Sequence, residues 1–312
     1  MKLRGAFLGF GAVTAFYVAA VLWIDSRNPV FSAIPELSSV LPTLLALSLL
    51  SYLVRYARWR WLLSRSGHQT AVAPGFFAYM AGFAFTATPG KVGELVRIRY
   101  LAPQGVAPSR VIAAFVYERA FDLMAVLMLA ALAVHRLDVF LFAVSFVVSF
   151  LAALVAVALS PAWLTRSSVY LRSWRLKRLA RLGLTLRDGL AGCRVWLTPL
   201  DATVSICAGI LAWSFNSLSF IILLQHLGVS IPLLSAAAIY PLATLAGAAS
   251  MVPGGVGSTE AAIVVLLSAF HVKFATAALA AVGIRFATLW FSMICGFVAL
   301  GVLEHSLVKK KN

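Results

Sequence analysis

Acidic residues are scarce in this sequence, and so are the side chains that carry most enzyme chemistry. Its 312 residues include 10 Asp and Glu, 3 Cys and 5 His, against 26 Lys and Arg. The cysteines form no CxxC pair, and the histidines have no spacing typical of a metal site. The motifs HExxH and GxSxG are absent, as are a P-loop, a GxGxxG after a strand and a spaced acidic cluster. We therefore expect no metal, no cofactor and no enzymatic activity.

Charge of either sign is rare, and the apolar residues form long runs. Hydrophobic residues make up 62% of the chain and charged residues 12%, which is too apolar for a soluble domain. A helix that crosses a bilayer needs about 20 apolar residues. The candidate full spans are 5–24, 40–54 (running on through 55–63), 111–134, 139–159, 202–224 and 276–303.

The net charge of +16 is unevenly distributed along the chain. Basic residues gather before the first span, after the second, between Arg166 and Arg194, and at Lys309–Lys311. The segments expected outside contain only Arg27, Arg136 and Lys273. This asymmetry is typical of cytoplasmic loops. It predicts a multi-pass protein of the bacterial cytoplasmic (inner) membrane with both termini in the cytoplasm and a first span that is retained.

Two apolar stretches remain, and each leads to a Pro-Gly break. They are Pro74–Thr88 and Leu233–Val252. A full crossing by the first would place Lys91, Arg97 and further arginines outside, against the charge rule. We therefore predict two re-entrant helical hairpins, at about 74–101 and 233–270, that enter from opposite faces. Broken backbone at membrane depth requires surrounding protein or a water-filled cavity.

The two halves of the chain resemble each other around these breaks. Pro89-Gly90-Lys91-Val92-Gly93 is followed by Glu94, and Pro253-Gly254-Gly255-Val256-Gly257 is followed by Glu260. About thirty residues later each half has an arginine near a phenylalanine, Arg119 and Arg285. We predict an all-α integral membrane protein with six full transmembrane helices and two re-entrant hairpins. The halves 1–134 and 135–312 would be inverted-topology repeats, the plan of many transporters.

The breaks are the candidate binding site for an anionic group. Proline and glycine open the helix, and a half-helix that starts there points N–H groups and its positive dipole end into the site. The candidate substrate-binding residues are Lys91, Arg119, Arg285, Gly90, Gly93, Gly254, Gly255 and Gly257. The alternative is that each break is a tight turn between packed helices.

Acidic residues accompany the candidate cations. Glu118 and Asp122 are four residues apart and share a helix face with Arg119 close by. Charges at such depth are costly and usually pair or face a cavity. We expect Glu94, Glu118, Asp122 and Glu260 to pair with the arginines or to relay protons. Internal salt bridges that fix the hairpins are the compatible alternative.

The segment 163–196 alternates basic and apolar residues at helical spacing. This pattern predicts an interfacial helix that lies on anionic lipid. A solvated linker helix or an RNA-binding patch is the competing interpretation. Without an aromatic-rich platform or a known module, we expect no nucleic-acid partner.

Taken as a set, these motifs resemble those of a known family. Pro89-Gly90-Lys91-Val92-Gly93-Glu94, Glu118-Arg119 with Asp122, and Pro253–Gly257 with Glu260 are similar to the flippase-like family of the lysylphosphatidylglycerol synthase transmembrane region. The resemblance covers nearly the whole chain. It implies translocation of a lipid or lipid-linked headgroup, either a phospholipid or a polyprenyl-phosphate type. In the synthases that carry this region an aminoacyl-transferase domain follows it; we expect none here, so the resemblance does not imply lipid aminoacylation.

Three functions remain open on the sequence. We favour a lipid flippase that moves an anionic or lipid-linked headgroup between leaflets. The second is an intramembrane lipid-modifying enzyme, phosphatase-like, that uses Ser258 and the acids. The third is a non-transporting scaffold that recruits a cell-envelope enzyme through 163–196.

Overall fold

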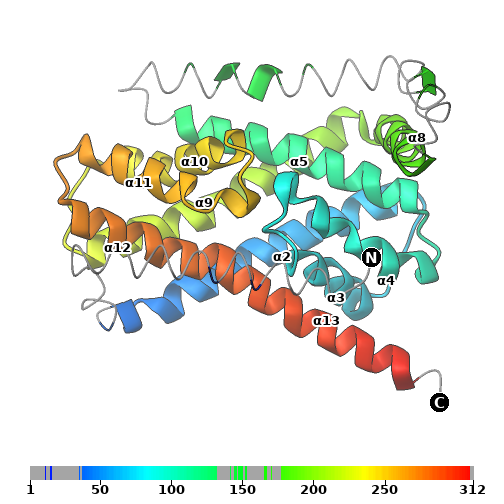
Figure 1. Cartoon of the computed structure of the whole chain (residues 1–312), viewed down its shortest axis with the longest axis horizontal. Helices are drawn as coiled ribbons and strands as arrows, with labels where there is room; N and C mark the ends of the chain where they lie inside the picture. Colours follow the sequence, from blue (N-terminus) through cyan, green and yellow to red (C-terminus); the bar gives the residue numbers. More distant parts are fainter. Residues whose placement is uncertain are drawn as a thin grey trace.

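The computed structural model of the chain describes residues 37–131 and 177–309, together with a few isolated positions elsewhere (Figure 1). These residues form helices and turns, and they contain no strand. The all-helical fold is therefore confirmed for this part of the chain. The expected spans 5–24 and 139–159 and the start of the segment 163–196 lie outside the described residues.

Four long helices run from one end of the molecule to the other (Figure 1). They are α2 (Leu41–Arg65), α5 (Pro108–Ala130), α9 (Pro199–His226), and α12 (Phe274–Arg285) continued through the π-helical turn η7 (Phe286–Trp290) into α13 (Phe291–Lys309). Each overlaps one expected span. In α2, α5 and α9, a proline in the first turn supplies a φ angle suited to helix initiation.

Length and composition distinguish these helices from one another. Within the described residues, Pro199–His226 and Phe274–Ser306 are both long and apolar enough to cross a membrane. Helix α2 has 25 residues and α5 has 23, so both are also long enough, but charged side chains interrupt them. The six full crossings that the sequence predicts therefore stay a prediction.

The turn η7 is held by helix α2. A π-helical turn leaves carbonyl groups of the helix without their usual partners. The Ser48 hydroxyl donates to the Ala287 carbonyl at 2.7 Å, and the Tyr52 hydroxyl donates to the Thr288 carbonyl at 2.9 Å. The Tyr240 hydroxyl, on helix α10 (Leu233–Ala249), lies 2.7 Å from the Thr288 hydroxyl. Polar groups that the π turn exposes are thus satisfied by side chains of neighbouring helices.

Both Pro-Gly segments turn the chain back on itself. The first hairpin comprises α3 (Val72–Phe83), η2 (Pro89–Val96) and α4 (Arg97–Leu101), which is followed by η3 (Ala102–Gln104). The second comprises α10 (Leu233–Ala249), η6 (Pro253–Gly255) and α11 (Ser258–Ser268). Helix α3 packs against η2 and α4, and α10 packs against α11. Re-entry of these hairpins into a bilayer stays a prediction.

Each hairpin packs on the long helix that follows the other hairpin. Helix α3 lies against α13, and α10 lies against α5, while α2 lies along α9 and η2 touches η6. Exchanging the two halves leaves this set of contacts unchanged. Such mutual packing is what repeats related by a pseudo-two-fold axis produce. The inverted topology of the halves stays a prediction.

The two ends of the molecule differ in character. At one end Arg65 pairs with Asp201 at 3.1 Å and Arg99 pairs with Glu304 at 2.9 Å, which joins α2 to α9 and α4 to α13. At the other end the start of α2 packs in an apolar cluster with α9, α10, α11 and α12. The first hairpin lies toward the first end and the second hairpin toward the other (Figure 1).

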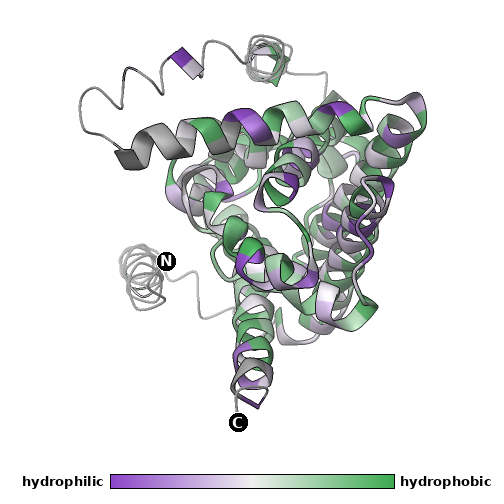
Figure 2. Cartoon of the chain, turned by 90° about the vertical axis from the view of Figure 1, so that its right-hand side faces the viewer, coloured by the Kyte–Doolittle hydropathy of each residue, from purple (hydrophilic) through white to green (hydrophobic). Residues whose placement is uncertain are grey.

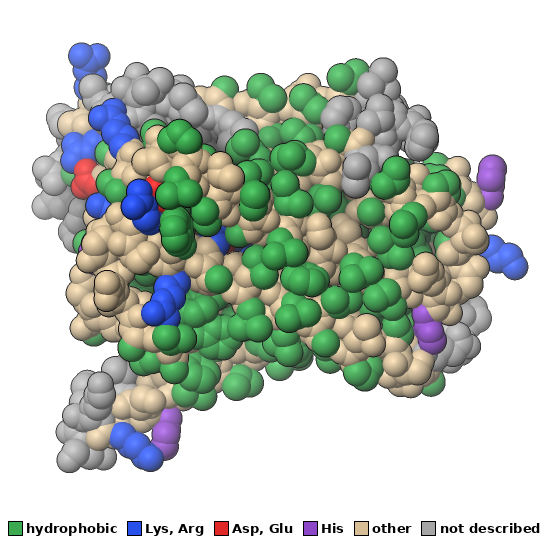
Figure 3. Space-filling model, turned by 180° about the vertical axis from the view of Figure 1, so that it is seen from behind, with side chains coloured by type: hydrophobic (Ala, Val, Ile, Leu, Met, Phe, Trp, Pro, Cys, Tyr) green, Lys and Arg blue, Asp and Glu red, His purple; other side chains and the backbone are tan. Residues whose placement is uncertain are grey.

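The outer surface between the ends is apolar. Hydrophobic residues lie on the outward as well as the inward faces of the helices (Figure 2). On the face shown in Figure 3 they cover the middle, and Lys, Arg and His side chains lie toward the two ends. Leu53, Val265 and Val298 are 49%, 66% and 62% exposed. Soluble monomers rarely expose apolar surface on this scale, whereas a membrane protein does so facing lipid.

Part of the segment 163–196 forms a helix bound to α5. Helix α8 (Lys177–Gly192) packs along α5, and the Arg110 guanidinium donates to the Gly192 carbonyl at 3.0 Å. The following turn, η5 (Cys193–Trp196), places the Trp196 indole N–H 2.7 Å from the Leu62 carbonyl. The helix is thereby fixed at the end that carries Arg65 and Asp201. Its contact with anionic lipid stays a prediction.

Candidate functional site

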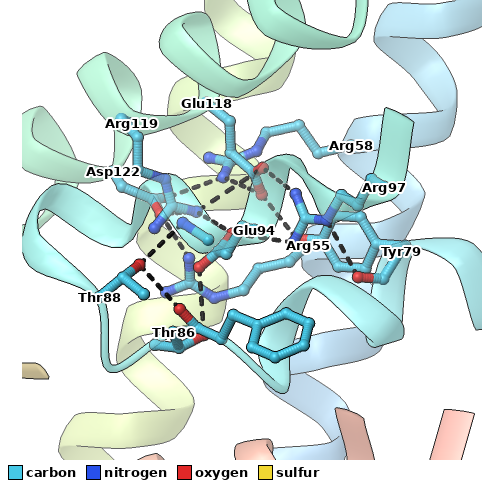
Figure 4. A network of polar contacts seen from close by, with 12 residues as sticks. Arg55, Arg58, Tyr79, Thr86, Thr88, Glu94, Arg97, Glu118, Arg119 and Asp122 are labelled. Atoms are coloured by element: carbon cyan, nitrogen blue, oxygen red, sulfur yellow. Dashed lines mark hydrogen bonds and ion pairs between the residues drawn. The ribbon is translucent and has the colours of Figure 1, made fainter. Parts of the chain in front are cut away.

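A cluster of buried charged side chains joins α2, the first hairpin and α5 (Figure 4). Its paired members are Arg55, Arg58, Glu94, Arg97, Glu118, Arg119 and Asp122. The side chains of Arg58, Glu94, Arg97 and Glu118 are at most 1% exposed. We call these seven residues, together with Lys91, the arginine cluster.

The two acids of α5 connect the arginine cluster to α2. Asp122 accepts from Arg58 Nη2 at 2.7 Å through Oδ1, and from Arg55 Nη1 through Oδ2. Glu118 Oε1 accepts from Arg58 Nη2 at 3.1 Å and from the Tyr79 hydroxyl at 2.6 Å. Both acids therefore face inward from one side of α5, as their spacing predicts. Proton relay by these acids stays a prediction.

Arg97 anchors the first hairpin within the cluster. Its Nη2 lies 2.9 Å from Glu94 and its Nη1 lies 3.4 Å from Glu118. The Arg97 guanidinium also stands over the ring of Tyr79, 4.0 Å from the centroid, in cation–π contact. Gly82 makes room for it, because a Cβ there would overlap Arg97 Nε. With both carboxylates and the aromatic face engaged, Arg97 is a structural centre of the cluster.

Two cations are less fully engaged than the others. Arg119 lies 3.2 Å from Asp122 and 3.6 Å from Glu118, yet its buried Nε and Nη2 make no hydrogen bond. Lys91, within the break, is half-buried and near Arg119 and Glu94. Among the described residues, no carboxylate or other acceptor pairs with its ammonium group. These two side chains have capacity to bind an additional anion.

The backbone at the breaks offers fewer donors than expected. The Gly93 N–H donates to the Thr88 hydroxyl at 2.8 Å, and the Gly255 N–H donates to the Val252 carbonyl at 2.8 Å. The Gly257 N–H donates to Glu260 at 2.8 Å. These three donors are already used within the chain. Anion binding near the first break would therefore rest mainly on side chains.

The second hairpin holds a separate ion pair. Arg285 Nε donates to Glu260 at 3.0 Å, and Arg285 Nη2 donates to the Gly254 carbonyl. Glu260 also caps the start of α11 through the Gly257 N–H. Arg285, at the end of α12, therefore attaches that helix to the second hairpin. Binding of one headgroup by Arg285 together with Arg119 and Lys91 stays a prediction.

The tips of the two hairpins are in contact. A Cβ on Gly254 would lie 3.2 Å from Ala87 Cβ and 3.6 Å from Leu289 Cδ2. Gly254 has a φ of 65°, a conformation that glycine adopts readily. The meeting of the two breaks thus depends on the missing side chain at this position. The arginine cluster lies beside one tip, and the Arg285–Glu260 pair lies beside the other.

Sequence reasoning missed four members of this site. Arg55 and Arg58 contribute from α2, and Arg97 and Tyr79 contribute from the first hairpin. One signal was available: Arg55 and Arg58 are three residues apart in a helical pattern otherwise rich in apolar residues. Within residues 37–131 and 177–309, no three His, Cys, Asp or Glu side chains come together as a metal site.

Comparisons with known proteins agree with this picture. A family described as the lysylphosphatidylglycerol synthase TM region matches residues 7–296. A UPF0104 membrane protein of Methanocaldococcus jannaschii is 23% identical over 111 residues, which cover 36% of this chain and 33% of the relative. The aligned region is therefore about a third of that relative's length. No solved structure matches the chain.

Proposed function

Because the chain belongs to the lysylphosphatidylglycerol synthase transmembrane-region family, we propose that it moves a lipid with an anionic headgroup between the leaflets of the bilayer. Membership of that family implies a membrane protein with a lipid-related role. The observation that carries the finer proposal is the arginine cluster, which lies beside the break of the first hairpin and retains two incompletely engaged cations.

A burial argument supports this proposal. Charged groups inside a bilayer are expensive, and they persist where they pair with one another or serve a function. Glu118, Asp122 and Glu94 neutralise part of the positive charge of the arginine cluster. No described carboxylate pairs with Lys91, and an anionic headgroup would neutralise its charge.

We further propose a membrane arrangement for this activity. The six spans and two re-entrant hairpins would lie in the cytoplasmic membrane, with the Arg65 and Arg99 end and both termini in the cytoplasm. The acyl chains would stay against the apolar outer surface while the headgroup passes the hairpin tips. Without a nucleotide-binding motif, transport would use the lipid gradient or a coupled ion.

The test is transport by the purified full-length chain in proteoliposomes. Fluorescent phosphatidylglycerol would be placed in both leaflets, and a membrane-impermeant reductant would report the lipid that reaches the outer leaflet. We expect protein-dependent transport, which Lys91→Gln and Arg119→Gln lower by about 10-fold, the effect of losing one charged contact of about 1.4 kcal/mol.

Lys273→Gln is the matched control for this assay. Lys273 is exposed at the N-cap of α12, where the opposite apolar end of the molecule begins, so its removal should leave transport unchanged. Protein that stays folded and monodisperse but moves no anionic lipid would overturn the proposed function. Equal transport by wild type and both cluster variants would remove the cluster from it.

We also propose that the protein is not an enzyme. The Ser258 hydroxyl lies 2.9 Å from the Ser250 hydroxyl and donates to the Gly255 carbonyl at 3.1 Å. In the described part of the chain, no imidazole or carboxylate hydrogen-bonds to it. A lipid product formed by wild type and lost in Ser258→Ala would contradict this proposal.

A further inference from the structure

The arginine cluster contains more positive than negative groups. Its cations are Arg55, Arg58, Lys91, Arg97 and Arg119, and its acids are Glu94, Glu118 and Asp122. Five positive and three negative groups leave an excess of two positive charges. Four of the cations are arginines, which do not deprotonate in proteins. Four arginines against three acids make one of the two excess charges permanent, and Lys91 supplies the other.

No other described acid is free to neutralise this excess. Seven of the ten acidic residues are described, and four of these lie outside the cluster. Each of the four has a basic partner of its own: Asp188 with Arg187, Asp201 with Arg65, Glu260 with Arg285 and Glu304 with Arg99. An anion that is not one of the described residues would therefore be needed to neutralise the excess positive charge of the arginine cluster.

The two cations beside the break are the least fully hydrogen-bonded members of the arginine cluster. Lys91 is half-buried on the break, and Arg119 presents buried Nε and Nη2 groups that lack hydrogen bonds. Arginine binds phosphate oxygens through its planar fork, and lysine acts as a compact point charge. Arg58 and Arg97 are held by carboxylates and maintain the positions of the others.

We infer that the arginine cluster selects a doubly charged phosphate, the terminal phosphomonoester of a lipid headgroup, over a singly charged phosphodiester. A phosphomonoester carries a charge of about −1.5 to −2 at pH 7, because its second pKa is about 6. A phosphodiester has one negative charge and would leave one of the two excess positive charges without a counter-charge. The inference rests on the proposed function and narrows its substrate to one headgroup chemistry.

The test compares fluorescent phosphatidic acid with fluorescent phosphatidylglycerol of the same acyl chains in the proteoliposome assay. We expect wild type to move phosphatidic acid about 10-fold faster, since one more desolvated charge contact contributes about 1.4 kcal/mol. Equal rates for both lipids would overturn the charge selection and leave the proposed function standing. Transport of neither lipid would instead refute the proposed function.

A charge-changing variant and pH give independent readouts. Lys91→Gln lowers the excess to one, so the rate ratio of the two lipids should fall toward one, whereas Lys91→Arg should keep it. Below about pH 6 the phosphomonoester gains a proton and becomes singly charged, so the ratio should fall there as well. A ratio that is insensitive to both changes would contradict the inference, since a merely structural Lys91 would not alter selectivity.

Inorganic phosphate distinguishes a lipid headgroup from a free ion as the source of the dianion. If the site takes any dianionic phosphate, millimolar phosphate should inhibit phosphatidic acid transport and raise the melting temperature of wild type but not of Lys91→Gln. If the acyl chains are required, phosphate should have no effect while the lipid preference persists. Both results support the inference, and a loss of lipid preference overturns it in either case. Sodium chloride at matched ionic strength is the control.

Discussion

The two hairpins share a backbone design and differ in their charge. In each, a Pro-Gly break has positive φ angles and stands beside buried charged residues. At the second break one arginine meets one carboxylate, Arg285 with Glu260, and the arginine also holds the Gly254 carbonyl. At the first break five cations meet three acids. The two breaks therefore share a backbone conformation and differ in the charged side chains beside them.

This difference distinguishes an ion pair that only stabilises its hairpin from a cluster that we also propose to bind a ligand. A neutral, mutually satisfied pair such as Arg285–Glu260 has little left to offer a ligand, but it fixes its hairpin to the long helix α12. In the arginine cluster, Arg97 fixes the first hairpin, while Lys91 and Arg119 are less fully hydrogen-bonded than the other cations. We expect Arg285→Gln to lower stability without changing lipid selectivity, and Lys91→Gln to change lipid selectivity with little effect on stability.

The largest effect should come from Arg58→Ala, which tests whether the arginine cluster also supports the fold. Arg58 is fully buried and joins Glu118 and Asp122, so its loss leaves two carboxylates short of a partner. We expect destabilisation of about 3–5 kcal/mol, measured as the free energy of unfolding in detergent. Arg60→Ala is the control, because Arg60 is an exposed neighbour on the same helix. Equal losses of unfolding free energy in the two variants would contradict a stabilising role for the arginine cluster.

A smaller effect should follow from Arg285→Gln at the second hairpin. The Glu260 carboxylate loses a charged partner and the Gly254 carbonyl loses a charged donor, at a cost of about 2–3 kcal/mol. Hydrogen exchange across residues 250–260 should rise, while the rate ratio of phosphatidic acid to phosphatidylglycerol stays unchanged. Adding Glu260→Gln should recover part of the stability. A changed lipid ratio would mean that both hairpins contribute to the binding of the headgroup.

The two break glycines sharpen the comparison further. Gly90 and Gly254 have φ angles of 60° and 65°, so alanine at either position costs about 1 kcal/mol in backbone strain. A Cβ at Gly254 would also press on Ala87 at 3.2 Å, whereas at Gly90 the nearest atom, on Val92, is 3.8 Å away. We expect Gly254→Ala to lower the melting temperature more than Gly90→Ala. The reverse order would argue against contact between the tips.

The smallest effect on stability should come from Lys91→Gln. Lys91 is half-buried and unpaired beside other cations, so its removal takes away repulsion and no salt bridge. We expect the free energy of unfolding to change by no more than about 0.5 kcal/mol, although transport falls. A large loss of stability would show that Lys91 has a structural role and would make the transport result ambiguous.

Much of this architecture can be predicted from local sequence. The span at 40–54 with its continuation through 55–63, the two turns at Pro89 and Pro253, and the inward face shared by Glu118 and Asp122 follow from the apolar run, proline and helical spacing. Those signals depend only on residues that are close along the chain. The structure agrees with them because the same residues begin, break and orient the helices.

The partners from α2 could not be predicted in the same way. Arg55 and Arg58 lie sixty or more residues before the acids that they bind, and the charge rule assigned them to the cytoplasmic edge of the span. Helix α2 continues to Arg65, close to the expected continuation through 55–63, and it carries both arginines inside the bundle.

The π-helical turn η7 gives one helix two attachments. The segment before it packs on α11 of the second hairpin, and the segment after it packs on α3 of the first. Any displacement of one hairpin therefore bends or rotates a helix that the other hairpin also grips. The turn itself is tied to Ser48 and Tyr52, on the same helix that presents Arg55 and Arg58 to the arginine cluster. The two hairpins are thus connected through α2 and the continuous helix α12–α13, which the Ser48 and Tyr52 hydroxyl groups join.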